Sequence, residues 1–259
     1  MPIGLSAVKP SESYAAPGES NALNEPRGNL LMTDSAHHSH PEATGFHKLL
    51  KEGTQALHDQ AEVGEFQSRM VHGDLARSEF ASFLTQMLHL HQAVDGMYDE
   101  AAAKDDRFAS IYDPKAHKRT HLIQKDLEDL GVSDLSPAFE TTQAFVNSVR
   151  EMLDASPISV LGVLYVKEGA TNGNKFVLKR IQSALGLPEA HAVGYMDPHG
   201  MEQRKRWNQF KRDLNELNLT DEDQNACLEV ARQCFQMFMD ISACVSEHFD
   251  RQHSAVEPG

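Results

Sequence analysis

His58 is the histidine whose surroundings in the sequence point most directly to chemistry, although it is one of 14 in the chain. It falls on the apolar face of a predicted helix, beside the small residues Gly53, Thr54 and Ala61, which leave room for a large flat group to approach. Neutral imidazole is a common metal ligand, and it is also commonly packed in protein cores. The spacing by itself leaves both interpretations open.

Two charged residues on the same side of this helix favour the ligand interpretation. Glu62 follows His58 by four residues, where its carboxylate can accept the second ring N–H and orient the imidazole. Lys51 precedes His58 by seven residues, where an ammonium group can meet an acidic group at the rim of a pocket. The alternative for both is an ordinary solvated side chain.

A glycine-bearing segment, Glu-Gly-Ala-Thr-Asn-Gly-Asn at residues 168–174, interrupts an otherwise strongly helical stretch. Each glycine in a helix interior costs about 1 kcal/mol relative to alanine. Gly169 and Gly173 therefore indicate a bend, a helix surface that another group touches closely, or a plain loop between two shorter helices. The segment lacks the GK[ST] sequence and the preceding strand of a phosphate-binding loop.

A basic segment at residues 204–212 stands out in a chain whose formal net charge is -14. It is either a solvated helix face or a site for the carboxylates of a ligand. Such a site would use one of two faces, the first with Gln203, Arg204 and Lys211 and the second with Lys205, Asn208 and Arg212. The net negative charge disfavours nucleic acid as a partner. The longest apolar run, residues 158–166, is too short for a membrane span, which takes about 20 residues.

The elements that would position these residues are helices, because apolar residues recur at helical spacing from Phe46 onward. The predicted helices cover residues 46–61, 78–103, 115–131, 137–154, 158–186, 200–217 and 221–250. No alternating strand pattern is visible, so we predict the all-α class and a single-domain helical bundle at residues 45–250. Residues 1–44, rich in proline and small polar residues, are a predicted disordered extension, and residues 251–259 a C-terminal tail.

The cysteines and the N-terminal sequence bear on the cellular compartment. The three cysteines, Cys227, Cys234 and Cys244, all fall in one predicted helix, which argues against a disulfide framework. The first residues lack the basic and apolar regions of a secretory signal. We therefore expect a cytoplasmic protein.

The run LKEGTQALHDQAE at residues 50–62 closely resembles the proximal helix of heme oxygenases. The resemblance continues in LHLHQAVD at residues 88–95, HLIQKDL at 121–127, LYVKEG at 164–169 and the basic segment ending at Arg212. It covers about residues 46–250. It implies the heme oxygenase fold, with a kinked, glycine-bearing distal helix.

The resemblance also implies roles for the residues that bind heme. His58 would be the ligand of the heme iron and Glu62 would orient it. Lys51 would face a heme propionate, and Tyr165 would contact the heme from the distal helix. The second propionate partner would be Arg212, or Lys211 if the alignment shifts by one residue.

On the other face of the heme, the resemblance implies a close approach of the distal helix backbone at Gly169 and Gly173. Crowding there would direct oxygen to one edge of the ring. The chain departs from the family pattern at two places. Ala170 stands where the animal-type branch has an aspartate, and Asn174 stands where the family has another glycine, which leaves the distal geometry open.

The activity implied is oxidative cleavage of heme, at once substrate and cofactor, to biliverdin, carbon monoxide and iron. An external electron donor such as a ferredoxin or a reductase is implied, because the chain has no flavin or nicotinamide motif. Iron acquisition and bilin supply to a photoreceptor are both compatible purposes. Two alternatives remain: a non-catalytic heme-binding or heme-trafficking protein, and a diiron oxygenase of the same fold. The isolated candidates for ligands of two irons are Glu62, His91 and Asp95, without the paired Glu and Glu-x-x-His sets of such sites.

Overall fold

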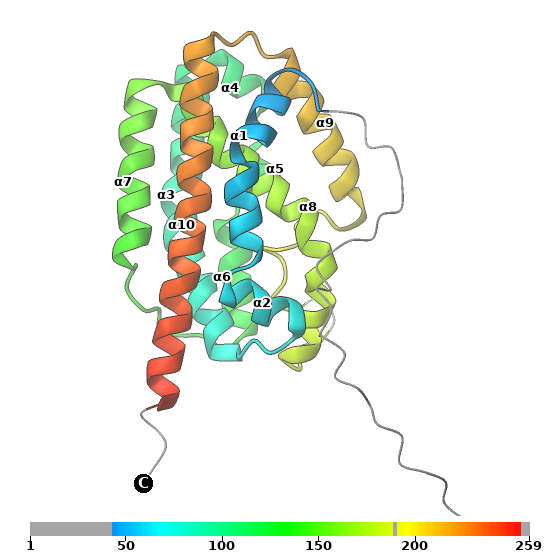
Figure 1. Ribbon diagram of the computed structural model, residues 1–259, viewed down its shortest axis with the longest axis vertical. Coiled ribbons are helices and arrows are strands. Elements are labelled where there is room, and N and C mark those ends of the chain that lie inside the picture. Colours follow the sequence, from blue (N-terminus) through cyan, green and yellow to red (C-terminus); the bar gives the residue numbers. More distant parts are fainter. Residues whose placement is uncertain (1–42, 189–190, 255–259) are drawn as a thin grey trace, which may run out of the picture. The chain divides into compact units, whose positions relative to one another are not determined.

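The computed structural model describes residues 43–188 and 191–254, and all regular structure within them is helical (Figure 1). The α-helices are α1 (Gly45–Glu62), α2 (Glu65–His72), α3 (Arg77–Lys104), α4 (Asp106–Ile111), α5 (Pro114–His117), α6 (Thr120–Asp129), α7 (Glu140–Ala155), α8 (Leu161–Ala184), α9 (Gln203–Glu216) and α10 (Asp221–Ser254). Two 3-10 helices, η1 (Pro157–Val160) and η2 (Gly200–Glu202), precede α8 and α9. The all-α prediction is confirmed. Residues 1–42 of the predicted extension and 255–259 of the predicted tail lie outside the described residues.

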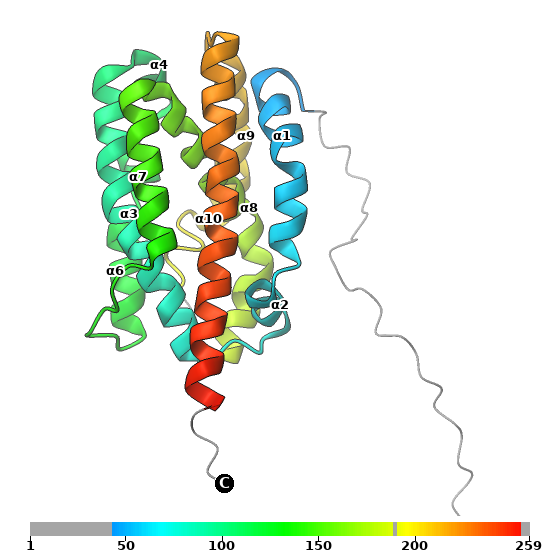
Figure 2. The same ribbon diagram turned by 60° about the vertical axis from the view of Figure 1, so that its left-hand side comes forward.

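The helix α10, 34 residues long, is the element around which the others pack. It contacts α1, α2, α3, α7 and α8, and Figures 1 and 2 show α3 and α7 on one side of it and α1 on the other. The core between these helices includes the completely buried side chains of Leu50, Leu84, Leu164 and Ile241. Burying such a side chain stabilises the fold by about 1.5–3 kcal/mol, so the amphipathic faces account for the arrangement. Within the described residues, no helix combines the length and the apolar character that a membrane crossing requires.

Close contact between α8 and α10 depends on Gly162. A Cβ built on Gly162 would lie 2.2 Å from the carbonyl oxygen of Cys227 and 2.8 Å from the backbone nitrogen of Ala231. Only a residue without a side chain allows the two backbones to approach this closely. The start of α8 is thereby held directly against the first third of α10.

The glycine-bearing segment at residues 168–174 is part of one continuous helix, because α8 runs from Leu161 to Ala184. The interpretation of this segment as a loop between two shorter helices is therefore wrong. Tertiary packing explains the difference, since α8 lies against α2, α9 and α10 along its length. Packing of this kind outweighs the low helix propensity of two glycines.

The single helix predicted at residues 115–131 is instead two helices, α5 and α6. The carboxylate of Asp95, on α3, accepts hydrogen bonds from the backbone N–H groups of Arg119 and Thr120 at 3.0 and 2.9 Å. It also accepts a 2.6 Å bond from the Thr120 hydroxyl. These hydrogen bonds to a residue of α3 satisfy N–H groups at the start of α6, which begins at Thr120 and is separate from α5.

Two short helices, α2 and α4, were not predicted. The first buries Phe66 and Met70, and the second buries Phe108 and Ile111. Each is at most eight residues long, too short for the helical period to repeat in the sequence. Their contacts with the rest of the bundle stabilise them.

Candidate functional site

His58 lies near the end of α1 and is half-exposed, with 49% of its side-chain surface accessible. Its ring meets the ring of Phe235, on α10, edge to face, with 5.9 Å between the centroids. The buried residues of α1 are Phe46, His47, Leu50, Thr54 and Ala61, so the apolar face on which the sequence places His58 is buried only in part. The imidazole lies at the edge of the face, where a ligand can reach it.

Glu62 lies beside His58, as the spacing predicts. One of its carboxylate oxygens is 3.7 Å from Nδ1 of His58, slightly beyond hydrogen-bond distance. Asp59 is at a similar distance, 3.8 Å from the same nitrogen. Two carboxylates therefore stand next to one ring nitrogen, and the other ring nitrogen is left for a ligand.

His47 is the buried histidine of α1, only 8% exposed, and no feature of the sequence pattern distinguished it. Its ring packs against Tyr165 of α8 and Trp207 of α9, with centroids 6.2 and 6.0 Å away. Burial and the positive charges of Lys211 and Lys51 lower the pKa of His47 to about 4, so the ring is neutral at pH 7. Three helices thus converge on an uncharged aromatic cluster.

Tyr165 belongs to this cluster through α8. Its side chain is buried, and its ring lies 5.9 Å from that of Trp207. Burial raises the pKa of Tyr165 to about 12, while the neighbouring Thr54 of α1 opposes the shift. The phenol is therefore neutral at pH 7.

Lys51 and Lys211 bring positive charge to the edge of the aromatic cluster from α1 and α9. Burial and the positive charges of Lys51, Arg204 and Arg212 lower the pKa of Lys211. Nζ of Lys211 lies 5.6 Å from the centroid of the Trp207 ring. Within the described residues, neither lysine forms an ion pair, so positive charge gathers here without a carboxylate to compensate it.

Arg212, the other candidate from the basic segment, is placed differently. Its side chain is exposed and donates a hydrogen bond to Gln209 on the same helix. Of the two alternatives that the sequence left open, Lys211 is the residue that contacts the aromatic cluster. The helical period of α9 separates the two side chains by about 100°, which explains their different surroundings.

The four candidate residues of the distal segment have unequal surroundings. A Cβ built on Gly169 would lie 3.6 Å from the Trp207 ring, whereas one built on Gly173 would meet nothing within 4 Å. Ala170 is exposed. The side-chain amide of Asn174 donates a 3.3 Å hydrogen bond to the carbonyl oxygen of Met196. Trp207 therefore covers the first glycine, and the second borders open space.

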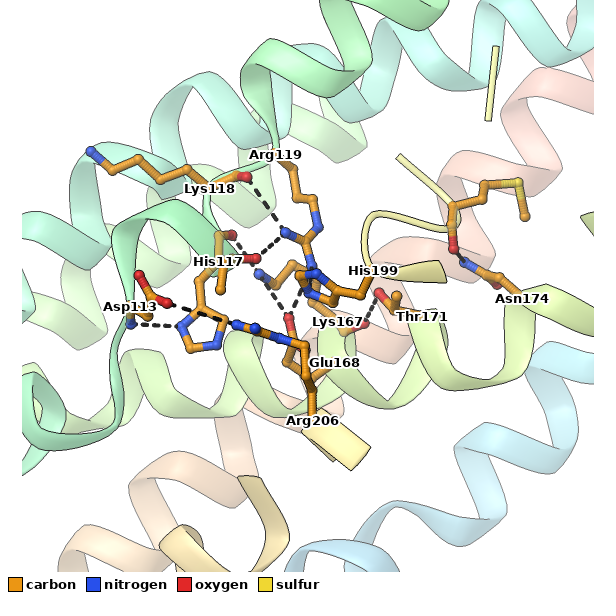
Figure 3. Close-up of polar contacts among 12 residues, drawn as sticks. Asp113, His117, Lys118, Arg119, Lys167, Glu168, Thr171, Asn174, His199 and Arg206 are labelled. Carbon is orange, nitrogen blue, oxygen red and sulfur yellow. Dashed lines mark hydrogen bonds and ion pairs between the residues drawn. The ribbon is translucent and has the colours of Figure 1, made fainter. Parts of the chain in front are cut away.

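A cluster of buried charges, also missed from the sequence, lies directly before Gly169. The carboxylate of Glu168 accepts a 3.1 Å hydrogen bond from Arg119 and is 3.3 Å from Nζ of Lys167 (Figure 3). Burial opposes the ionisation of Glu168, but the charges of Lys167 and Arg119 outweigh it and lower its pKa. Burial and Arg119 lower the pKa of Lys167 to about 7. Because Lys167 and Glu168 are neighbours in the chain, their burial depends on tertiary contacts that no helical pattern reveals.

The candidate ligands of a diiron site are not brought together. Nδ1 of His91 lies 3.6 Å from Asp95, but the Asp95 carboxylate is occupied by the start of α6. Glu62 lies at the end of α1 and is about half-exposed, at 52% of its side chain. Across residues 43–188 and 191–254, no three His, Cys, Asp or Glu side chains gather in a group that could hold a metal ion.

The chain is similar to several known proteins. A family model described as heme oxygenase matches residues 44–243. Heme oxygenase 1 of Gallus gallus is 25% identical over 240 residues, covering 88% of this chain and 80% of that protein. Heme oxygenase 2 of Rattus norvegicus is 25% identical over 230 residues, covering 86% and 71%.

Solved structures show the same fold. Heme oxygenase-2 from Synechocystis sp. PCC 6803, in complex with heme and NO, has a TM-score of 0.74 at 20% identity and covers 81% of this chain and 88% of that one. Heme oxygenase-1 from the same cyanobacterium, in complex with heme, has a TM-score of 0.73 at 18% identity and covers 82% and 97%.

Proposed function

Because the chain belongs to the heme oxygenase family, whose general function is heme degradation, we propose that it cleaves heme to biliverdin, carbon monoxide and iron. The observation that carries the proposal is the accessible imidazole of His58 on α1, within the segment that the family model matches. An accessible imidazole can bind iron through a ring nitrogen. Heme would be both substrate and cofactor, and its iron would supply the oxygen chemistry.

The side chains beside His58, together with the two lysines at the edge of the aromatic cluster, suit a flat, apolar, dianionic ligand. Phe235 offers an aromatic edge beside His58. Lys51 and Lys211 bring positive charge that no carboxylate compensates within the described residues, and two propionates would do so. Glu62 would accept the second ring N–H of His58 after a small rotation and so orient the imidazole.

The distal side is assigned to the glycine-bearing part of α8. Gly173 borders open space, and Ala170 adds only a methyl group there, so this part of the helix can lie close to a ring. Tyr165 would contact the heme from the same helix. Asn174 would act indirectly, since its amide is bonded to the segment around Met196.

We also propose an electron donor, a fate for the product and a cellular compartment. An external donor, such as a ferredoxin or a reductase, would deliver the electrons. Biliverdin would leave as product, either as waste from iron release or for a bilin-binding photoreceptor. We propose that the protein acts in the cytoplasm.

The test begins with hemin added to the purified protein and the visible spectrum recorded. We expect a Soret-type complex, and formation of biliverdin when a reductant is added in air. His58→Ala should change the axial-ligand spectrum and abolish turnover, whereas His121→Ala, at an exposed histidine of α6, should do neither.

Three results would contradict the proposal. A wild-type protein without a Soret-type complex, or a His58→Ala variant with an unchanged spectrum, would exclude His58 as the ligand. A stable heme complex that yields no biliverdin with reductant and air would instead identify a non-catalytic heme-binding protein.

A further inference from the structure

Three charged side chains, those of Lys167, Glu168 and Arg119, are buried together at Glu168, the residue that precedes Gly169 (Figure 3). Lys167 and Glu168 belong to α8 and are 8% and 2% exposed, and Arg119, at the start of α6, is 1% exposed. One carboxylate oxygen of Glu168 receives both cations, Arg119 at 3.1 Å and Lys167 at 3.3 Å. We call these three residues the charge cluster.

The charge cluster ties α8 to the chain between α5 and α6. Nζ of Lys167 donates a 2.5 Å hydrogen bond to the carbonyl oxygen of His117. Arg119 donates to the carbonyl oxygen of Ala116, and its other terminal nitrogen lies 3.4 Å from Nε2 of His199. The segment at residues 119–120 is itself bonded to Asp95 of α3. The rotation of α8 before Gly169 is thus fixed against two other helices.

A second attachment holds the other end of the glycine-bearing segment. The amide of Asn174 donates to the carbonyl oxygen of Met196 at 3.3 Å. The chain around Met196 is anchored in turn, because the carboxylate of Asp126 accepts hydrogen bonds from the backbone of Gly194 and Tyr195 at 2.8 and 2.7 Å. Polar side-chain contacts therefore bracket Gly169 and Gly173 on both sides.

Stability alone does not account for the charge cluster. Removing a charged group from water is unfavourable, and buried ion pairs are often no more stabilising than apolar residues of the same volume. Nε of Arg119 is also buried without a hydrogen-bond partner among the described residues. Two glycines, by contrast, lower the stability of the helix at the place where the cluster holds it. What the cluster provides is a defined position for a weak part of α8.

We infer that Lys167, Glu168 and Arg119 position the glycine-bearing part of α8 over the substrate and thereby select the edge of the heme ring that is opened. The inference rests on the proposed function. Heme has four bridging carbons, and on the proposed function the position of the helix backbone over the ring would decide which of them is attacked. The three residues act through Gly169 and the backbone that follows it, so they are positioning residues and not catalytic ones.

The first test needs neither heme nor turnover. Hydrogen exchange is measured on heme-free wild type, Glu168→Gln, Arg119→Lys and Lys167→Met. Exchange of peptides that cover residues 169–174 should be about tenfold faster in the variants, because local opening of α8 costs less free energy. The control is Glu100→Gln, which breaks an exposed pair with Arg150 and should leave this segment unchanged.

The second test measures the biliverdin isomers by chromatography after reaction with hemin, reductant and air. The variants should still show the wild-type Soret spectrum, because His58 on α1 is untouched, and their isomer ratio should change by about threefold or more. A ratio equal to that of wild type in folded variants overturns the inference, as does unchanged exchange at residues 169–174.

The two tests separate this inference from the proposed function. If wild type forms no biliverdin, the proposed function and the selection of a ring edge are both wrong. The hydrogen-exchange result still decides whether the charge cluster fixes the position of α8. If Glu168→Gln does not fold, Lys167→Met decides the question, because it removes one charge and leaves the pair of Glu168 and Arg119 intact.

Discussion

Replacing Gly173 with alanine should stabilise the heme-free protein and at the same time impair ring opening. Gly173 lies inside α8, and a Cβ added there meets nothing within 4 Å, so no clash opposes the substitution. Alanine is favoured over glycine in a helix interior by about 1 kcal/mol. For a domain of this size, that gain corresponds to a melting temperature higher by about 2–4 °C.

The expected loss of ring-opening activity in Gly173→Ala follows from the same open space beside Gly173. The proposed function places the heme beside this part of α8, and a methyl group would hold the backbone away from the ring. A loss of about 1.4 kcal/mol in transition-state stabilisation lowers the rate tenfold, and we expect an effect of at least this order. Thermal melting by circular dichroism measures the first effect, and single-turnover absorbance with hemin and reductant measures the second.

Gly162→Ala is the matched comparison within the same helix. Its Cβ would lie 2.2 Å from the Cys227 carbonyl oxygen, whereas ordinary contact begins at 3.4 Å, so α8 and α10 would separate by about 1.2 Å (3.4 − 2.2). Overpacking of this kind costs about 1–3 kcal/mol. A Gly173→Ala variant that melts below wild type, or that is stabilised and opens heme at the wild-type rate, would refute the reasoning.

Three further predictions follow from the geometry of individual side chains. Lys211→Met should weaken hemin binding in an absorbance titration while Arg212→Met does not, because only Lys211 contacts the aromatic cluster; equal effects would contradict this. The pKa of His47 is about 4 in the folded protein and near 6.5 unfolded, so the unfolded chain binds more protons between these values, and stability falls as the pH drops from about 6.5 to 4. His47→Phe should reduce this pH dependence in urea unfolding, and an unchanged slope would exclude the histidine as its source. Iodoacetamide should label Cys244 first in the folded protein, since burial raises the thiol pKa of Cys227 well above its usual range; mass spectrometry that finds Cys227 labelled as fast would show that this part of α10 opens.

Much of the candidate site could be predicted from the sequence because its signals are local. Lys51, His58 and Glu62 lie within four turns of one helix, and their common side follows from the helical period alone. The same period predicted the all-α class and most helix boundaries. The alternatives on α9 differed by one residue, and a choice between Lys211 and Arg212 required the neighbouring helices.

The tertiary structure decided those features of the fold and the site that depend on contacts between residues distant in the chain. Asp95 splits a predicted helix into α5 and α6, because its carboxylate is the hydrogen-bond partner of a segment 24 residues later. The positions of α8 and α9 beside α1 make His47 a buried neutral ring. His58, which contacts α10, is half-exposed.

The buried pair of Arg119 and Glu168 is the clearest example, since the two residues are 49 positions apart. The helical period reports which side of a helix is apolar, and it carries no information about which charge lies opposite. The sequence by itself therefore determined the helices and the ligand-bearing motif on α1. The tertiary structure alone decided which charges are buried beside Gly169, because burial and pairing are set by the partners that folding brings together.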